Sequence, residues 1–138
     1  MNNSLIIYCD GGSRGNPGEA AYGFVVYNEK NETMYSEGKK IGIATNNIAE
    51  YTAVVKALQW VKESKMNPVS ISFFFDSTLV TNQLKGLFKV KNEHLRSMVF
   101  SVKLLEKEIG AQFTYKSIPR EQNKMADRMV NLALDNLI

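Results

Sequence analysis

The spacing of the apolar residues changes abruptly near residue 45, and this change limits the possible folds more than any other feature of the chain. Before it, short apolar runs and alternating segments are typical of β-strands, which we predict at residues 5–9, 20–28 and 34–43. After it, residues 46–65 carry apolar side chains at helical spacing until Pro68 ends the segment. We therefore expect a meander of three antiparallel strands followed by a helix.

Strands and helices alternate in the rest of the chain. We predict strands at residues 69–75 and 111–118, and helices at 76–84, 92–109 and 121–137. The strand at 5–9 is apolar on both faces, so we expect it at the centre of the sheet, beside the strand at 69–75. The predicted fold class is α/β, a mixed five-stranded sheet with three antiparallel strands and then two parallel ones, flanked by helices. The length of 138 residues suits a single domain, 1–138.

Four acidic residues lie where an unpaired charge is unfavourable. Asp10 ends the first apolar strand, and Asp76 directly follows the fourth strand. Glu50 lies near the start of its helix on the apolar face, and Asp127 shares a helical face with Val130. In the predicted sheet Asp10 and Asp76 fall on neighbouring strands, and helix ends can bring the other two carboxylates to the same edge.

Each carboxylate also has a purely structural interpretation. Asp10 can stabilise a turn, and Glu50 is favoured near a helix N-terminus. Asp76 can cap a helix, and Asp127 can pair with a nearby arginine. Four carboxylates together, in a chain with one cysteine and one histidine, instead suit a hard cation such as Mg²⁺ or Mn²⁺. Two such ions can promote phosphodiester hydrolysis, whereas a glycosidase needs only two carboxylates.

Composition gives only weak information about the partners and the cellular location of the protein. The net charge of +3 leans weakly toward a polyanionic partner. One cysteine excludes a disulfide framework, so we expect a cytoplasmic protein. The longest apolar runs are about five residues, against roughly 20 for a bilayer span, and neither a signal peptide nor a membrane partner is expected. No feature demands more than a monomer.

The glycine-rich segment 11–18 (GGSRGNPG) is predicted to be a turn. It is not a phosphate-binding loop of the nucleotide-binding kind, because no Gly-Lys-Ser/Thr follows and the next element is a strand. We expect it to bring backbone amides and Asn16 close to a ligand. The short polar side chains of Thr45, Asn46 and Asn47 can cap the helix, contact sugar and phosphate, or do both.

Four motifs, in order and spacing, resemble those of type 1 ribonuclease H. They are residues 8–18 (YCDGGSRGNPG), 45–50 (TNNIAE), 75–77 (FDS) and 123–127 (NKMAD). The first motif is long and specific, and the resemblance covers nearly the whole chain. It implies endonucleolytic hydrolysis of the RNA strand of an RNA–DNA hybrid, which leaves 5′-phosphate and 3′-hydroxyl ends.

The resemblance also implies roles for individual residues. Four residues match the metal-binding carboxylates of the family: Asp10, Glu50, Asp76 and Asp127. The expected cofactor is Mg²⁺, with Mn²⁺ as an alternative. The residues matching nucleic-acid contacts are Asn16, Asn46 and Asn47 for the RNA strand, Thr45 and Asn123 for a DNA phosphate, and Phe88 for the DNA channel. Contacts near the 2′-hydroxyl would let the protein distinguish RNA from DNA.

The chain departs from the family pattern in two places. Many members carry a histidine in the loop before the last carboxylate, whereas residues 117–122 have none, and we expect Arg120 or Glu121 to take its role. The basic connector at 85–96 is short, and Phe88 stands where other members have a tryptophan. These departures keep a second hypothesis open, a non-catalytic or weakly active hybrid-binding protein.

Overall fold

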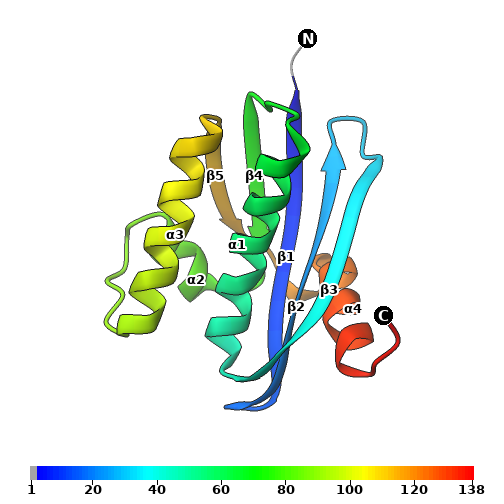
Figure 1. Ribbon diagram of the computed structural model, residues 1–138, viewed down its shortest axis with the longest axis vertical. Helices are drawn as coiled ribbons and strands as arrows, with labels where there is room; N and C mark the ends of the chain where they lie inside the picture. The colour runs from blue at the N-terminus through cyan, green and yellow to red at the C-terminus, as the bar shows by residue number, and fades with distance from the viewer. Residues whose placement is uncertain (1–2) are drawn as a thin grey trace.

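Five strands form one mixed sheet in the computed structural model, which describes residues 3–138 (Figure 1). The strands are β1 (Ser4–Gly15), β2 (Gly18–Asn28), β3 (Thr33–Ala44), β4 (Ser70–Phe75) and β5 (Gln112–Ser117). The helices are α1 (Asn46–Ser64), α2 (Thr78–Leu84), α3 (Glu93–Ile109) and α4 (Lys124–Leu134), with a short 3₁₀ helix at Arg120–Gln122.

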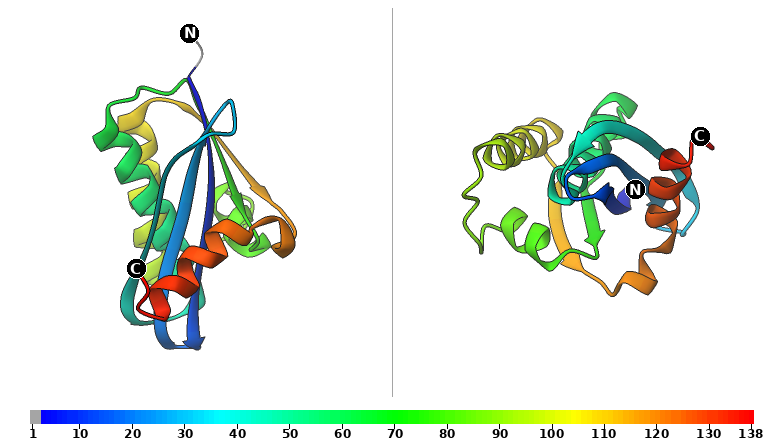
Figure 2. Two further views of the ribbon diagram at one scale, coloured as in Figure 1. Left: turned by 90° about the vertical axis from the view of Figure 1, so that its right-hand side faces the viewer. Right: turned by 90° about the horizontal axis from the view of Figure 1, so that it is seen from below.

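The strands lie in the order β3-β2-β1-β4-β5. β1 and β2 are antiparallel, as are β2 and β3, whereas β1 and β4, and β4 and β5, are parallel. Helices α1 and α3 cover one face of the sheet, and α4 packs on the other face over β1, β2 and β3 (Figure 2). The predicted fold class, element order and central first strand are confirmed.

Side chains that alternate along β1 separate the core from the opposite face of the sheet. Leu5, Ile7 and Cys9 are buried in the main core, which α1 covers. Because successive side chains on a strand point to opposite faces, Tyr8 and Asp10 point to the face on which α4 lies. The carboxylate of Asp10 is therefore outside the apolar core although its strand is central.

Helix α1 approaches β1 most closely at Gly11. A Cβ atom at this position would lie 2.3 Å from the carbonyl carbon of Ala49 and 2.4 Å from the backbone nitrogen of Glu50. Only a residue without a side chain permits so close a contact. The glycine after Asp10 thus lets the start of α1, with Glu50, rest against the strand that carries Asp10.

Helix α4 is seated on the sheet in a similar way. A Cβ atom at Gly38 of β3 would lie 2.4 Å from the carbonyl oxygen of Met129, so the helix backbone lies directly on the strand. A small apolar cluster holds the helix there: Ala21, Val130, Ala133 and Leu134. Asp127 lies one turn before this cluster, and the packing of α4 therefore determines where its carboxylate lies.

Two of the predicted boundaries are wrong. Residues 11–15 belong to β1, because they stay paired with β2 as far as Gly15 opposite Gly18, and the chain reverses only at Asn16 and Pro17. The last helix is shorter than 121–137, because residues 120–122 form a 3₁₀ helix and α4 ends at Leu134. Beyond that end Asn136 has a left-handed φ of 57°, which breaks the helical path.

Candidate active site

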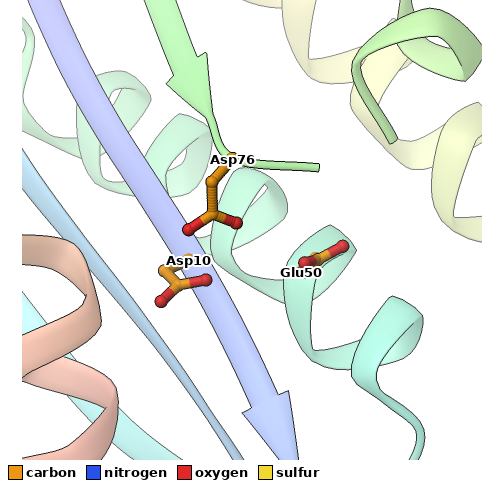
Figure 3. Close-up of side chains that lie close together, drawn as sticks. All are labelled: Asp10, Glu50 and Asp76. Atoms are coloured by element: carbon orange, nitrogen blue, oxygen red, sulfur yellow. The ribbon is translucent and has the colours of Figure 1, made fainter. Parts of the chain in front are cut away.

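Three carboxylates from three elements converge at the carboxyl end of β4, beside the central strand β1 (Figure 3). Asp10 lies on β1, Asp76 directly follows β4, and Glu50 lies near the start of α1. One carboxylate oxygen of each residue lies within 4.8 Å of those of the other two. The predicted convergence of these three side chains is therefore present in the fold.

The register of two parallel strands brings Asp10 and Asp76 together. Tyr8 of β1 pairs with Phe74 of β4, and the two aspartates follow two residues later on each chain. Asp76 does not cap α2, because Ser77 occupies the N-cap and accepts a backbone N–H from the first turn. The capping interpretation of Asp76 is wrong, and its carboxylate lies with the cluster instead.

Burial and mutual repulsion disfavour full ionisation of the cluster. Burial, and then the charge of Asp76, raise the pKa of Asp10 to about 8, although a 2.9 Å hydrogen bond from the Gly11 backbone opposes the rise. Burial, and then Asp76, also raise the pKa of Glu50 to about 7. Closely spaced carboxylate oxygens are the donors that Mg²⁺ and Mn²⁺ prefer, and a cation would relieve this repulsion. The donor set therefore fits the expected metal.

The carboxylates line an open cavity of about 440 Å³. Asp127 lines it from α4 but does not belong to the group of three whose oxygens lie within 4.8 Å. Arg120, from the 3₁₀ helix, also lines the cavity, which places a guanidinium on the wall of the acidic site. Glu121 is exposed and is not among the lining residues, so Arg120 is the better placed of the two candidates for the missing histidine.

Hydrogen bonds join the tip of the β1–β2 hairpin to the start of α1. Oδ1 of Asn46 accepts a bond from the backbone nitrogen of Ser13 (2.8 Å), and Oδ1 of Asn16 accepts one from the backbone nitrogen of Asn46 (3.0 Å). Thr45 caps α1, as predicted from the sequence. Asn47 follows in the same turn and is half-buried. Of the three predicted RNA-contacting residues, Asn46 lines the cavity, Asn16 is hydrogen-bonded to the backbone of Asn46, and Asn47 follows next in the chain.

Two predicted DNA contacts differ in exposure. Phe88, in the segment between α2 and α3, is 49% exposed and accessible to a ligand. Asn123 is only 1% exposed, and its Nδ2 donates to the carbonyl of Cys9 at 2.9 Å and lies 3.5 Å from Oδ2 of Asp76. The amide of Asn123 ties the start of α4 to β1 behind the carboxylates. Its contact with a DNA phosphate stays a prediction.

Comparison with known proteins identifies the family. Residues 8–133 match the family model described as reverse transcriptase-like. A ribonuclease H of Clostridium botulinum is 35% identical over 153 residues, which cover 95% of each chain. The chain belongs to the type 1 ribonuclease H family. A bifunctional protein of Mycobacterium tuberculosis is 38% identical over 132 residues, and the chain spans 35% of the length of that relative.

Solved structures of ribonuclease H1 proteins share the whole fold. LC11-RNase H1, isolated from compost, has a TM-score of 0.92 with 37% identity and covers 99% of both chains. The same protein in complex with an RNA/DNA hybrid has a TM-score of 0.91 with 36% identity and covers 96% of this chain and 98% of its own. Within residues 3–138, no helix combines the length and apolar character needed to cross a bilayer.

The cavity of this ribonuclease H domain also includes polar residues that the sequence analysis did not single out. Arg14 lines it from β1 and Asn131 lines it from α4. Both follow from simple periodicity once the elements are known, since Arg14 lies four residues after Asp10 on a strand and Asn131 lies four after Asp127 on a helix. The signal for Arg14 was missed because its segment was predicted to be a turn.

The raised pKa values predict that the metal-free domain loses stability as the pH rises from about 5 to 8. Asp10 and Glu50 bind protons more tightly in the folded chain, at pKa values of about 8 and 7, than in the unfolded chain, at 3.8 and 4.5. A raised carboxyl pKa stabilises the fold at low pH, and this contribution is lost as the pH passes through the folded value. Thermal unfolding in chelator across this range should show a falling Tm.

Adding metal across the same pH series is the control for this prediction. Mg²⁺ or Mn²⁺ should restore most of the lost Tm at pH 8, because the cation binds the ionised carboxylates, and should add little at pH 5. Asp10→Asn should flatten the fall, because it removes the group with the higher pKa. A Tm in chelator that is level from pH 5 to 8 would contradict the assigned electrostatics.

Proposed function

We propose that the protein is a divalent-metal-dependent endoribonuclease that hydrolyses the RNA strand of RNA–DNA hybrids. The observation that most supports this proposal is that carboxylate oxygens of Asp10, Glu50 and Asp76 lie within 4.8 Å of one another at an open cavity. A pure binding protein gains nothing from gathering negative charge where a phosphate must approach. The name of the Clostridium relative and the hybrid complex of LC11-RNase H1 support the choice of substrate.

Mg²⁺ is the cofactor we propose, as two ions, with Mn²⁺ as an alternative. Asp10, Glu50 and Asp76 would hold the metal, and Asp127 stands on the neighbouring wall of the cavity. The bound ions would supply an activated water and would stabilise the leaving oxygen. In the proposed reaction the water oxygen forms a bond to phosphorus, the bond from phosphorus to the 3′ oxygen breaks, and that oxygen gains a proton. The ends are then a 5′-phosphate and a 3′-hydroxyl.

The chain's own residues would bind and orient the hybrid around this centre. Asn16, Asn46 and Asn47 lie at the hairpin tip and the start of α1, where they can contact the RNA strand at its 2′-hydroxyls. Thr45, Asn123 and the exposed Phe88 are the proposed contacts to the DNA strand. Arg120 can place positive charge beside the departing phosphate, and this is the role we propose for it in turnover.

The proposal also covers the domain organisation, oligomeric state and cellular location of the protein. We propose a single domain, 1–138, that acts as a monomer in the cytoplasm. The single, buried and unpaired Cys9 supports a reducing compartment. The alternative is a hybrid-binding protein that keeps the fold without cleaving, which the missing loop histidine favours. Only a measurement of cleavage separates the two.

Cleavage of an end-labelled hybrid tests the proposal directly. We expect the RNA strand of the hybrid to be cut with Mg²⁺ or Mn²⁺ and to stay intact in chelator. Duplex DNA should stay intact throughout, and duplex RNA should be cut far less than the hybrid. If a folded sample binds the hybrid but does not cut it with either metal, the protein is the binding module and the proposed activity is wrong.

A further inference from the structure

The active-site cavity extends from the carboxylates along the β1–β2 hairpin. Asp10, Gly12 and Arg14 lie on the same face of β1, because side chains alternate along a strand. Arg14 lies four positions after Asp10 along the strand, which places their backbones about 13 Å apart. Gly12 between them carries no side chain, and all three residues line the cavity of about 440 Å³. The floor of the cavity is therefore open from the acidic cluster to a guanidinium.

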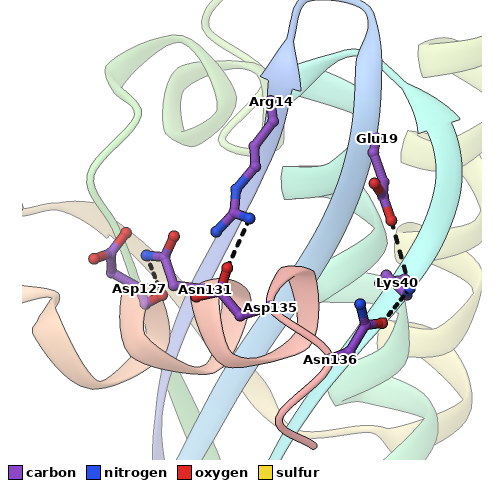
Figure 4. Close-up of polar contacts among 7 residues, drawn as sticks. All are labelled: Arg14, Glu19, Lys40, Asp127, Asn131, Asp135 and Asn136. Atoms are coloured by element: carbon purple, nitrogen blue, oxygen red, sulfur yellow. Dashed lines mark hydrogen bonds and ion pairs between the residues drawn. The ribbon is translucent and has the colours of Figure 1, made fainter.

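Helix α4 supplies the facing wall of this extension. Asp127 and Asn131 line it from one side of the helix, and Asp135 follows four residues later as the C-cap of α4. Nδ2 of Asn131 donates to the carbonyl oxygen of Asp127 at 3.1 Å. Arg14 reaches across from the hairpin, and its Nη1 lies 2.7 Å from Oδ1 of Asp135 (Figure 4).

The pair of Arg14 and Asp135 is poorly suited to a purely structural role. Their side chains are 50% and 48% exposed, and ion pairs exposed to this extent contribute little to stability. A guanidinium offers five N–H donors, and Asp135 is the one ion-pair partner of Arg14 in residues 3–138. Within the part of the chain that the structure describes, the other donors of Arg14 have no carboxylate partner, and Arg120 is the only other basic side chain that lines the cavity.

We propose that Arg14, oriented by Asp135, binds a backbone phosphate of the RNA strand beside the phosphate that is cut. The inference rests on the proposed function, because the strand held at the carboxylates is the strand that would continue along the cavity. Arginine suits this position, since its planar fork can keep one donor on a carboxylate and present others to phosphate. Asp135 is then a positioning residue that holds the guanidinium toward the strand.

Hybrid binding as a function of salt tests the contact. In an Asp10→Asn background that prevents cutting, Arg14→Ala should weaken binding about fivefold, the upper range for an exposed ion pair. It should also lower the slope of log affinity against log salt by about 1, as expected for one lost phosphate contact. Lys62→Ala is the matched control, because Lys62 pairs with Glu108 at 3.2 Å with similar exposure and lies outside the cavity. It should leave affinity and slope unchanged.

Two further measurements distinguish a phosphate contact of Arg14 from a purely structural link between the hairpin and α4. A neutral methylphosphonate, placed at each position beside the cut site in turn, should weaken wild-type binding at one position and leave Arg14→Ala binding unaffected there. Asp135→Asn should keep the full salt slope, because Arg14 keeps its charge. If the ion pair only links the hairpin to α4, Asp135→Asn and Arg14→Ala should weaken binding alike, and no single methylphosphonate should distinguish the wild type from Arg14→Ala. That result overturns the inference.

The proposed function and this inference fail in different ways. A wild-type domain that cuts no hybrid with either metal disproves the proposed function. A wild-type domain that cuts the hybrid, with Arg14→Ala binding it at wild-type affinity and salt slope, disproves only the role of Arg14.

Discussion

Asp10→Asn is expected to lower hybrid cleavage by a factor on the order of 10³ or more while the fold remains intact. Asp10 is the most buried of the three clustered carboxylates, and it lies beside Asp76 and Glu50. An amide keeps the shape of the side chain but removes the negative charge on which a divalent cation depends. Initial rates with saturating Mg²⁺, and with Mn²⁺, measure the loss.

The same substitution is expected to raise the stability of the metal-free domain at pH 8 by a few kcal/mol. Burial and the neighbouring charges raise the pKa of Asp10 to about 8, so its ionised form is unfavourable in the folded chain. Glu29→Gln is the matched control, because Glu29 is exposed in the turn after β2 and should alter neither rate nor stability. Wild-type cleavage by folded Asp10→Asn would remove Asp10 from the site.

The sheet was predictable because its signals are local. Alternation in β2, the apolar runs of β1 and β4, and the change of period before α1 each identify an element without knowledge of the others. The extension of β1 through residues 11–15 was not predictable in this way. Its glycines and Pro17 are typical of a turn, and only pairing with β2 makes the segment a strand.

The meeting of the carboxylates was predictable for the same reason, whereas the residues that support them were not. Asp10 ends the apolar run of β1 and Asp76 directly follows β4, and pairing of these parallel strands brings the two positions together. Asn123 depends instead on a hydrogen bond to Cys9, which lies 114 positions away in the chain. No local sequence pattern predicts this buried hydrogen bond. The close approach of α1 to β1 at Gly11 positions Glu50, and it too could not be predicted from the sequence.

Gly11→Ala is therefore expected to damage both the fold and the site. The added Cβ would lie 2.3 Å and 2.4 Å from backbone atoms of Ala49 and Glu50, which have no flexible side chain to move aside. Helix α1 must shift, and overpacking of this kind typically lowers stability by about 1–3 kcal/mol. A displacement of Glu50 by about 1 Å can lower the rate of hydrolysis about 100-fold.

Gly12→Ala separates the clash from a general effect of losing a glycine in this strand. Its Cβ would lie 3.9 Å from Oδ1 of Asn46 and from Cγ1 of Val130, which is ordinary van der Waals contact. Urea unfolding should therefore show a clear loss of stability for Gly11→Ala and little change for Gly12→Ala. Equal stabilities for the two variants would mean that α1 does not rest on β1 at Gly11. The position of Glu50 would then depend on the hydrogen bonds that link Asn46 to Ser13 and Asn16.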